Sequence, residues 1–166
     1  MQYVVTAMFM ILTCFHMGAA QAASPVERES LRGLPGVGLV IERISPDAKA
    51  NGLTEEAVQT SVELILRSSG IRILSASERW EELAAPFLLV QINTVKGNWS
   101  YAANVTVTFN QKVALISRPQ YVVFAPSWIN SVVVIAGFSK LRELVSIAIE
   151  PQIKEFANDF LAVNPR

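Results

Sequence analysis

One segment of the chain, from about residue 54 to 69, has the apolar spacing of an amphipathic helix. Its apolar residues recur at i, i+4 and i+7, which places them on one buried face. They are Val58, Val62 and Ile65. Thr54 is of the type that caps a helix N-terminus, and Gly70 is of the type that ends a helix in the left-handed conformation. The segment therefore predicts a helix whose two ends are both specified by its own residues.

Short aliphatic runs on either side of this helix predict strands. Residues 37–45 precede it and residues 71–74 follow it, and together with the helix they indicate a β-α-β unit. The segment 46–52 between the first strand and the helix is predicted to be a loop. After the second strand, a short helix is expected to start at Ser77 and to stop before Pro86.

The middle of the chain has the alternation of half-buried strands. Residues 87–95 predict one strand, and residues 101–110 alternate apolar with hydroxyl or amide side chains, as in an antiparallel strand with one face in water. Residues 118–120 are expected to interrupt this pattern, and residues 121–137 predict one long strand or two short ones around Pro126. The polar side of the alternating strand includes Asn104, Thr106 and Thr108.

Residues 139–162 predict a long C-terminal helix that carries two apolar stripes. The stripes are Leu141, Leu144, Val145 and Ala148, followed by Ile153, Phe156, Ala157 and Phe160. The second stripe lies roughly a quarter to a third of a turn from the first, so a kink or break is expected at Pro151 between them.

The order of these elements predicts an α+β fold. We expect a two-layer sandwich, in which the early helix (about 54–69) and the long C-terminal helix (about 139–162) cover one face of a mostly antiparallel sheet. The polar side of strand 101–110 would then face solvent or a partner.

The first 22 residues form a separate, uncharged and mostly apolar segment. Ala20 and Ala22 stand in the A-x-A pattern that a signal peptidase reads, which predicts a signal peptide of residues 1–22, cleaved after Ala22, and a periplasmic or secreted protein. The segment lacks a basic start, and retention as a membrane anchor is the alternative. Cleavage would leave a polar lead-in, residues 23–35, and a single domain, residues 36–166.

Composition narrows the classes of function. Cys14 and His16 are the single cysteine and histidine, and both precede the predicted cleavage site. A chain cleaved there has no disulfide, no Ser-His-Asp triad and no thiolate or imidazole metal site, so we expect neither a metal nor another cofactor. The 14 basic and 14 acidic residues balance, and no basic cluster indicates a nucleic-acid partner. The same balance argues against a strongly anionic membrane surface as partner. Contact with a membrane is expected only if residues 1–22 are retained.

Catalytic residues are not predicted. Glu78, Glu81 and Glu82 occur together in a short helix, and Glu42 and Asp47 lie elsewhere, but their spacing does not indicate the convergent pair that a glycosidase needs. The aromatic residues near strand ends are better candidates for a ligand or partner surface, with the polar strand face beside them. This candidate surface consists of Trp99, Tyr101, Tyr121, Trp128, Asn104, Thr106 and Thr108. The alternative is that the aromatics cover the ends of the sheet and that the polar face is simply solvated.

Several stretches resemble a family of small exported bacterial proteins. They are "GLTEEAVQTSVELILRSSGIRIL", "PFLLVQINTV", the Tyr-led alternating strand and the closing "FANDFLAVNP". The resemblance extends from about Leu31 to Pro165. It implies export and one small domain, and it transfers no active site. In element order alone, the chain is also similar to small α+β lipoproteins of the Gram-negative envelope, which act as plugs or assembly factors. It departs from them at Cys14, because Thr13 does not suit a lipobox.

The sequence thus favours a non-enzymatic exported protein that binds an envelope protein, a polymer or a small ligand. A hydrolase or transferase that uses carboxylates alone is the alternative from another class, and a membrane-tethered domain is the third.

Overall fold

The computed structural model describes residues 23–165, and the predicted signal peptide lies outside them. The elements run in the order α1 (Pro25–Glu29), β1 (Gly38–Ile41), α2 (Pro46–Ala50), α3 (Glu55–Ser68), α4 (Ala76–Glu81), β2 (Phe87–Lys96), β3 (Ser100–Leu115), β4 (Arg118–Gly137), the 3-10 turn η1 (Phe138–Lys140) and α5 (Leu141–Val163). Among the described helices, none is both long and apolar enough to cross a membrane.

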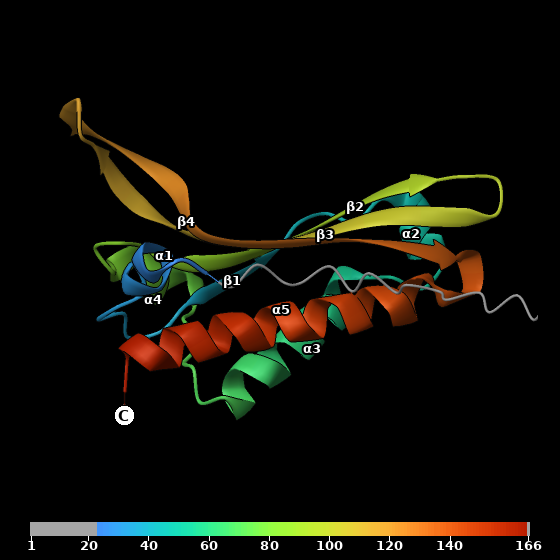
Figure 1. Cartoon of the computed structure of the whole chain (residues 1–166), viewed down its shortest axis with the longest axis horizontal. Helices are drawn as coiled ribbons and strands as arrows, with labels where there is room; N and C mark the ends of the chain where they lie inside the picture. Colours follow the sequence, from blue (N-terminus) through green and yellow to red (C-terminus); the bar gives the residue numbers. More distant parts are fainter. Residues whose placement is uncertain (1–22, 166) are drawn as a thin grey trace, which may run out of the picture.

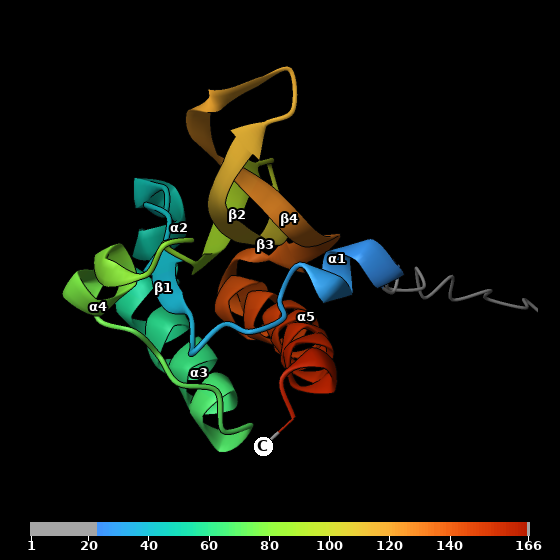
Figure 2. The same cartoon turned by 90° about the vertical axis from the view of Figure 1, so that its left-hand side faces the viewer.

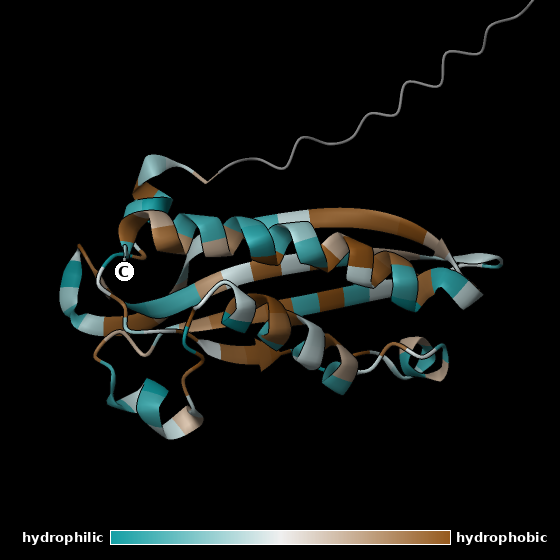
Figure 3. Cartoon of the chain, turned by 90° about the horizontal axis from the view of Figure 1, so that it is seen from below, coloured by the Kyte–Doolittle hydropathy of each residue, from teal (hydrophilic) through white to brown (hydrophobic). Residues whose placement is uncertain are grey.

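The fold is the predicted α+β sandwich. The four strands lie in the order β1-β2-β3-β4; β1 pairs with β2 in parallel, and the other two pairs are antiparallel. Helices α3 and α5 lie side by side against one face of the sheet (Figures 1 and 3). Neither α3 nor α5 covers the opposite face of the sheet, which is here called the outer face (Figure 2).

Helix α3 forms as its sequence predicts. The Thr54 hydroxyl accepts a hydrogen bond from the Ala57 amide at 3.2 Å, and Gly70 ends the helix with φ +77°. Val58 and Val62 are buried against the sheet, as is Leu66, whereas Ile65 is half-buried. The caps and the apolar stripe together position α3.

The predicted β-α-β unit is only partly right. The first strand ends at Ile41, and the chain predicted as a loop includes α2, because Ser45 caps that helix and Pro46 suits its first position. Residues 71–74 make no strand. Ile73 forms a single parallel bridge to Val37, and Ser75 then caps α4, so the pairing cannot continue. The parallel partner of β1 is instead β2.

Strand β4 runs from Arg118 to Gly137 as one strand, so the interruption predicted at residues 118–120 does not divide it. The pairing with β3 is nevertheless interrupted there, because Leu115 pairs with Arg118 and Ala114 with Val122, which leaves residues 119–121 without partners in β3. Phe109 pairs with Trp128 and Asn110 pairs with Pro126, which leaves Ser127 as an extra residue in a bulge. Bulges bend a strand and increase its twist. Beyond this bulge, residues 111–125 of β3 and β4, here called the arm, rise away from α3 and α5 (Figure 1).

Helix α5 runs through Pro151 without the expected break. Proline removes the hydrogen bond to the carbonyl four residues earlier, that of Ile147. Both Pro151 and Ile147 lie on the exposed side of α5, where water can take the place of the lost donor. On the inner side, Gln152 and its neighbours join the two predicted stripes into one buried face.

The residue after the α3 cap ties that helix to the preceding turn. The Oε1 atom of Glu55 accepts a hydrogen bond from the Ile44 backbone amide at 2.9 Å. The same atom forms an ion pair with the Lys49 Nζ at 2.7 Å. The Lys49 side chain and the Ile44 amide together lower the pKa of the Glu55 carboxyl from 4.5 to about 2. The ionised form of Glu55 is therefore favoured by folding.

We expect Glu55 to contribute to acid sensitivity. Because its pKa falls on folding, its contribution to the free energy of unfolding is complete above about pH 4.5 and is lost as the pH falls toward 2. The difference in thermal midpoint between the parent and Glu55→Gln should be largest at neutral pH and shrink in acid. Glu56→Gln, in the same helical turn but exposed, is the control. A midpoint difference for Glu55→Gln that does not change with pH would refute this role.

Candidate functional surface

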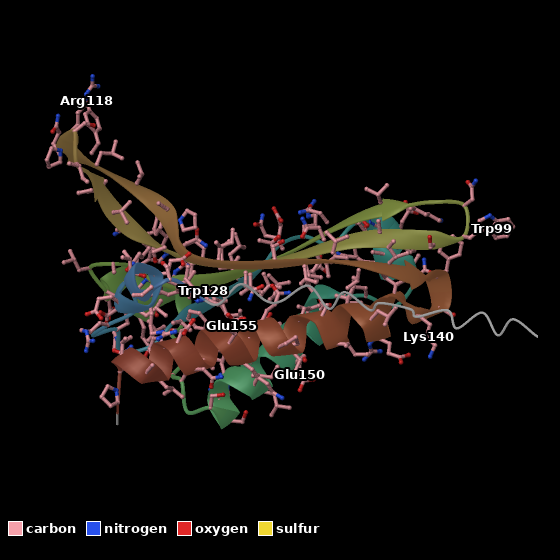
Figure 4. All side chains as sticks on the ribbon, in the orientation of Figure 1. Trp99, Arg118, Trp128, Lys140, Glu150 and Glu155 are labelled. Carbon is pink, nitrogen blue, oxygen red and sulfur yellow. The ribbon has the colours of Figure 1, made fainter. Side chains whose placement is uncertain are left out.

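The aromatic residues predicted as a ligand surface do not come together. Trp99 lies in the turn between β2 and β3 and is 87% exposed, whereas Tyr121 is exposed on the arm. The Trp99 turn and the tip of the arm, marked by Arg118, lie at opposite ends of the molecule (Figure 4). Tyr101 and Trp128 are buried in the core. The structure thus separates the four aromatics into two core residues and two distant exposed ones.

Tyr101 has a structural position. Its ring packs edge-on against Phe138 at 5.4 Å, and its hydroxyl donates to the Asp47 carbonyl at 3.0 Å. The same hydroxyl accepts a hydrogen bond from the Asn51 amide at 3.1 Å. Tyr101 therefore joins α2 to the end of the sheet. The alternation that puts it in phase with the apolar side of β3 indicated this burial.

The polar row on β3 lies on the outer face, as predicted. Thr106 donates to the Asn104 side chain at 3.1 Å and lies 2.9 Å from the Ser131 hydroxyl of β4. Thr108 is buried, and its hydroxyl accepts from Asn110 at 2.8 Å. These side chains partly satisfy one another, which suits a face without a covering layer. Their role as a partner surface stays a prediction.

Two carboxylates of α5, Glu155 and Asp159, lie one helical turn apart and contact side chains of β4. Glu155 is labelled in Figure 4. Asp159 accepts from the Arg28 Nε at 2.8 Å through one oxygen and from the Trp128 Nε1 at 3.0 Å through the other. Glu155 accepts from the Asn130 amide at 2.7 Å. Burial raises the pKa of the Glu155 carboxyl, and the nearby charge of Asp159 adds to the rise.

These contacts assign the carboxylate pair a structural role. Both oxygens of Asp159 already hold protein donors from α1 and β4, so neither is available to a substrate without breaking a packing contact. Two of the carboxylates considered from sequence are similarly engaged: Glu78 closes the capping box of α4, and Glu42 accepts from Gln91 at 2.9 Å. Within residues 23–165, no group of three or more acidic, histidine or cysteine side chains is placed to hold a metal ion.

The arm is the surface that the sequence analysis missed. Ile116 occupies its tip and is 99% exposed, and apolar side chains continue along both strands behind it. Those that are exposed are Leu115, Tyr121, Val122, Val123 and Phe124. Turns favour Gly, Asn, Asp, Ser and Pro, so an isoleucine at a turn in water has no stabilising role within the fold. Exposed apolar sets of this kind are typical of interaction surfaces.

Aromatic rings and cations fix the base of the arm. Phe124 packs edge-on against Trp80 of α4 at 5.8 Å and against Phe87 of β2 at 5.6 Å. The Arg79 guanidinium lies 4.9 Å from the Trp80 ring centre and 5.0 Å from that of Phe87. The Lys112 Nζ lies 5.4 Å from the Trp80 ring centre. The base thus joins α4, β2 and the arm, and holds two cations against aromatic faces.

A glycine makes room for this cluster. A Cβ atom on Gly38 of β1 would lie 2.7 Å from the Cδ of Arg79. Because Gly38 has no side chain, the Arg79 side chain can pass over β1 and reach the rings of Trp80 and Phe87. The backbone amide of Lys112 also donates to the Ala84 carbonyl at 2.8 Å, which ties the chain after α4 to the arm.

An open, mostly apolar groove of about 560 Å³ lies between the arm and the chain that follows α4. Leu83, 93% exposed, lies on its α4 side, and the arm supplies the other lining residues. They are Lys112, Ala114, Val122, Val123 and Phe124.

Basic and acidic residues are unevenly distributed along the chain, although their total numbers are equal. From residue 83 to 142 there are five basic residues and no acidic residue, so the remainder of the chain carries the compensating excess of acid. Counting charges by segment would have shown this. Within the described residues, neither Lys112 nor Arg118, the two charged residues of the arm, forms an ion pair.

The comparisons with known proteins are sparse. No family model matches the chain, and no curated protein matches it. Among solved structures, the chain is similar to the crystal structure of a minor lipoprotein from Acinetobacter baumannii, with 12% sequence identity over 77% of this chain and 93% of that chain, and a TM-score of 0.36. That TM-score is below the level that indicates a shared fold. The resemblance to small exported bacterial proteins therefore stays a prediction.

Proposed function

We propose that this protein is a non-enzymatic, exported binding protein of the cell envelope and that it engages its partner through the arm. The observation that carries the proposal is the exposed apolar set on residues 111–125, of which Ile116 at the tip is 99% exposed. Apolar surface of this extent on a projecting element is costly in water and gains free energy when a partner covers it.

The location of the arm supports binding rather than catalysis. Glu155 and Asp159 are held by donors of α1 and β4, and neither is among the residues that line the groove. The groove itself is lined by apolar side chains and one lysine, a composition that suits contact with an apolar segment. Export rests on the pattern of residues 1–22, which predicts a signal peptide.

Site-specific photocrosslinking in the cells that make the protein tests this function. A photoreactive residue replaces Ile116 or Val122 on the arm. In a matched control it replaces Leu64, which is 68% exposed on the solvent side of α3. We expect crosslinked products at both arm positions and none at position 64. Equal products at position 64, or no product at the arm, would refute binding through the arm.

A further inference from the structure

The arm combines exposed aliphatic side chains at its tip with two cations that form no ion pair within the described residues. Ile116 and Leu115 are exposed at the turn, and Arg118 follows within two residues, with its guanidinium at the end of the molecule (Figure 4). Lys112 lies further back on the same arm. The last acidic residues before the arm in the sequence are Glu81 and Glu82. They belong to the end of α4 and its cap, not to the arm.

We infer that the arm docks on an anionic lipid surface. In this arrangement Ile116 and Leu115 enter the boundary between headgroups and acyl chains, while Arg118 and Lys112 lie among the anionic headgroups. The inference rests on the proposed function, because it names the partner that the arm engages. It concerns contact by the arm, and it holds whether or not residues 1–22 are retained.

Charge complementarity supports this partner. The arm carries two cations and no acid, and both cations lack ion-pair partners within the described residues. Basic side chains near an anionic leaflet are attracted to it, and the attraction weakens with salt. Tyr121 on the arm and Trp80 at its base are both exposed, and tyrosine and tryptophan are residue types that favour the membrane–water boundary.

The shape of the arm also favours a lipid surface over a protein partner. A two-stranded tip offers few side chains, whereas a stable protein interface usually buries about 800 Å² on each partner. Entry of a few apolar side chains into a bilayer boundary needs no such complementary surface. The arm combines exposed aliphatic side chains with cations, a composition that suits the boundary between headgroups and acyl chains.

Quenching by brominated lipids measures the contact in the full chain. Ile116→Trp places a reporter at the tip, and Leu64→Trp places one on α3 as the matched control, each compared with the parent. With vesicles of phosphatidylglycerol and phosphatidylcholine that carry brominated acyl chains, we expect extra quenching for Ile116→Trp and none for Leu64→Trp. Vesicles of phosphatidylcholine alone should quench the tip reporter less, and added salt should reduce the quenching.

Flotation with the same vesicles gives the size of the effect. We expect Ile116→Asp to lower partitioning by about tenfold and Arg118→Gln by about fivefold, from the loss of a buried aliphatic side chain and of one headgroup-bound cation. Leu64→Asp should change partitioning by less than about twofold, because position 64 faces away from the lipid.

Two outcomes would overturn the inference. A tip reporter that is not quenched, or quenching at position 64 equal to that at position 116, would show that the arm does not enter the bilayer. If photocrosslinks then form between position 116 and a protein, the binding function stands with a protein partner. If neither quenching nor crosslinks occur, the proposed function falls as well.

Discussion

Replacement of Phe156 by alanine is expected to lower the free energy of unfolding by about 3–5 kcal/mol, the usual cost of truncating a buried phenylalanine. The Phe156 ring is fully buried on the inner face of α5. Its centre lies 5.6 Å from that of Phe109 on β3 and 5.3 Å from that of Trp128 on β4. The truncation would leave a cavity between the helix layer and two strands.

Chemical denaturation of Phe156→Ala and the parent measures this loss. Trp99→Ala is the control, because Trp99 is a larger aromatic residue but projects into solvent from a turn. We expect its effect to stay within about 0.5 kcal/mol. Similar losses for the two variants would contradict the assignment of one ring to the core and the other to the surface.

Removal of the Asp159 carboxylate is expected to have the second-largest effect. Asp159→Ala leaves the buried Trp128 indole N–H without its acceptor and frees Arg28. An unsatisfied buried donor costs about 1–3 kcal/mol. Arg28 is 42% exposed and recovers water contacts, so we expect a total loss of about 2–4 kcal/mol rather than the full cost of breaking a buried ion pair.

Two further variants isolate the cause of that loss. Asp159→Asn keeps an oxygen that can accept from Trp128 and should be less destabilised than Asp159→Ala. Glu143→Ala breaks an exposed pair with Lys140, 2.7 Å long, and should cost less than about 1 kcal/mol. In NMR spectra, the Trp128 indole resonance should shift in both Asp159 variants. An unshifted resonance, or equal losses for Asp159→Ala and Glu143→Ala, would count against the structural role of Asp159.

The helix α3 and strand β3 were predictable because each is specified locally. The hydroxyl of Thr54 caps α3, Gly70 adopts the positive φ that ends it, and alternation along β3 separates its two faces. The same alternation put Tyr101 on the buried side, although its position near a turn had suggested a binding surface.

Other features depend on contacts that sequence periodicity does not report. The run 71–74 has the composition of a strand, but Ile73 finds only one bridging partner before α4 begins. Trp128 faces the core because it pairs with the buried Phe109 and lies on the same side of β4 as the buried Asn130 and Ala136. The break expected at Pro151 is absent because that residue lies on the exposed side of α5.

The arm could have been suspected from charge, but its position could not. The acid-free stretch from residue 83 to 142 is visible in the sequence, whereas the net charge of zero suggested an unremarkable surface. That Ile116 projects from the molecule depends on the bulge at Ser127, which bends the paired strands away from the helices. The packing of Phe124 against Trp80 depends on the same bend.

The most direct test of the central claim compares photocrosslinking at Ile116 with that at Leu64 in the cells that make the protein. Both side chains are exposed and aliphatic, but one lies at the tip of the arm and the other on α3. Binding through the arm predicts crosslinks, to lipid or to protein, at position 116 and none at position 64. Equal yields at the two positions, or crosslinks at position 64 alone, would contradict it.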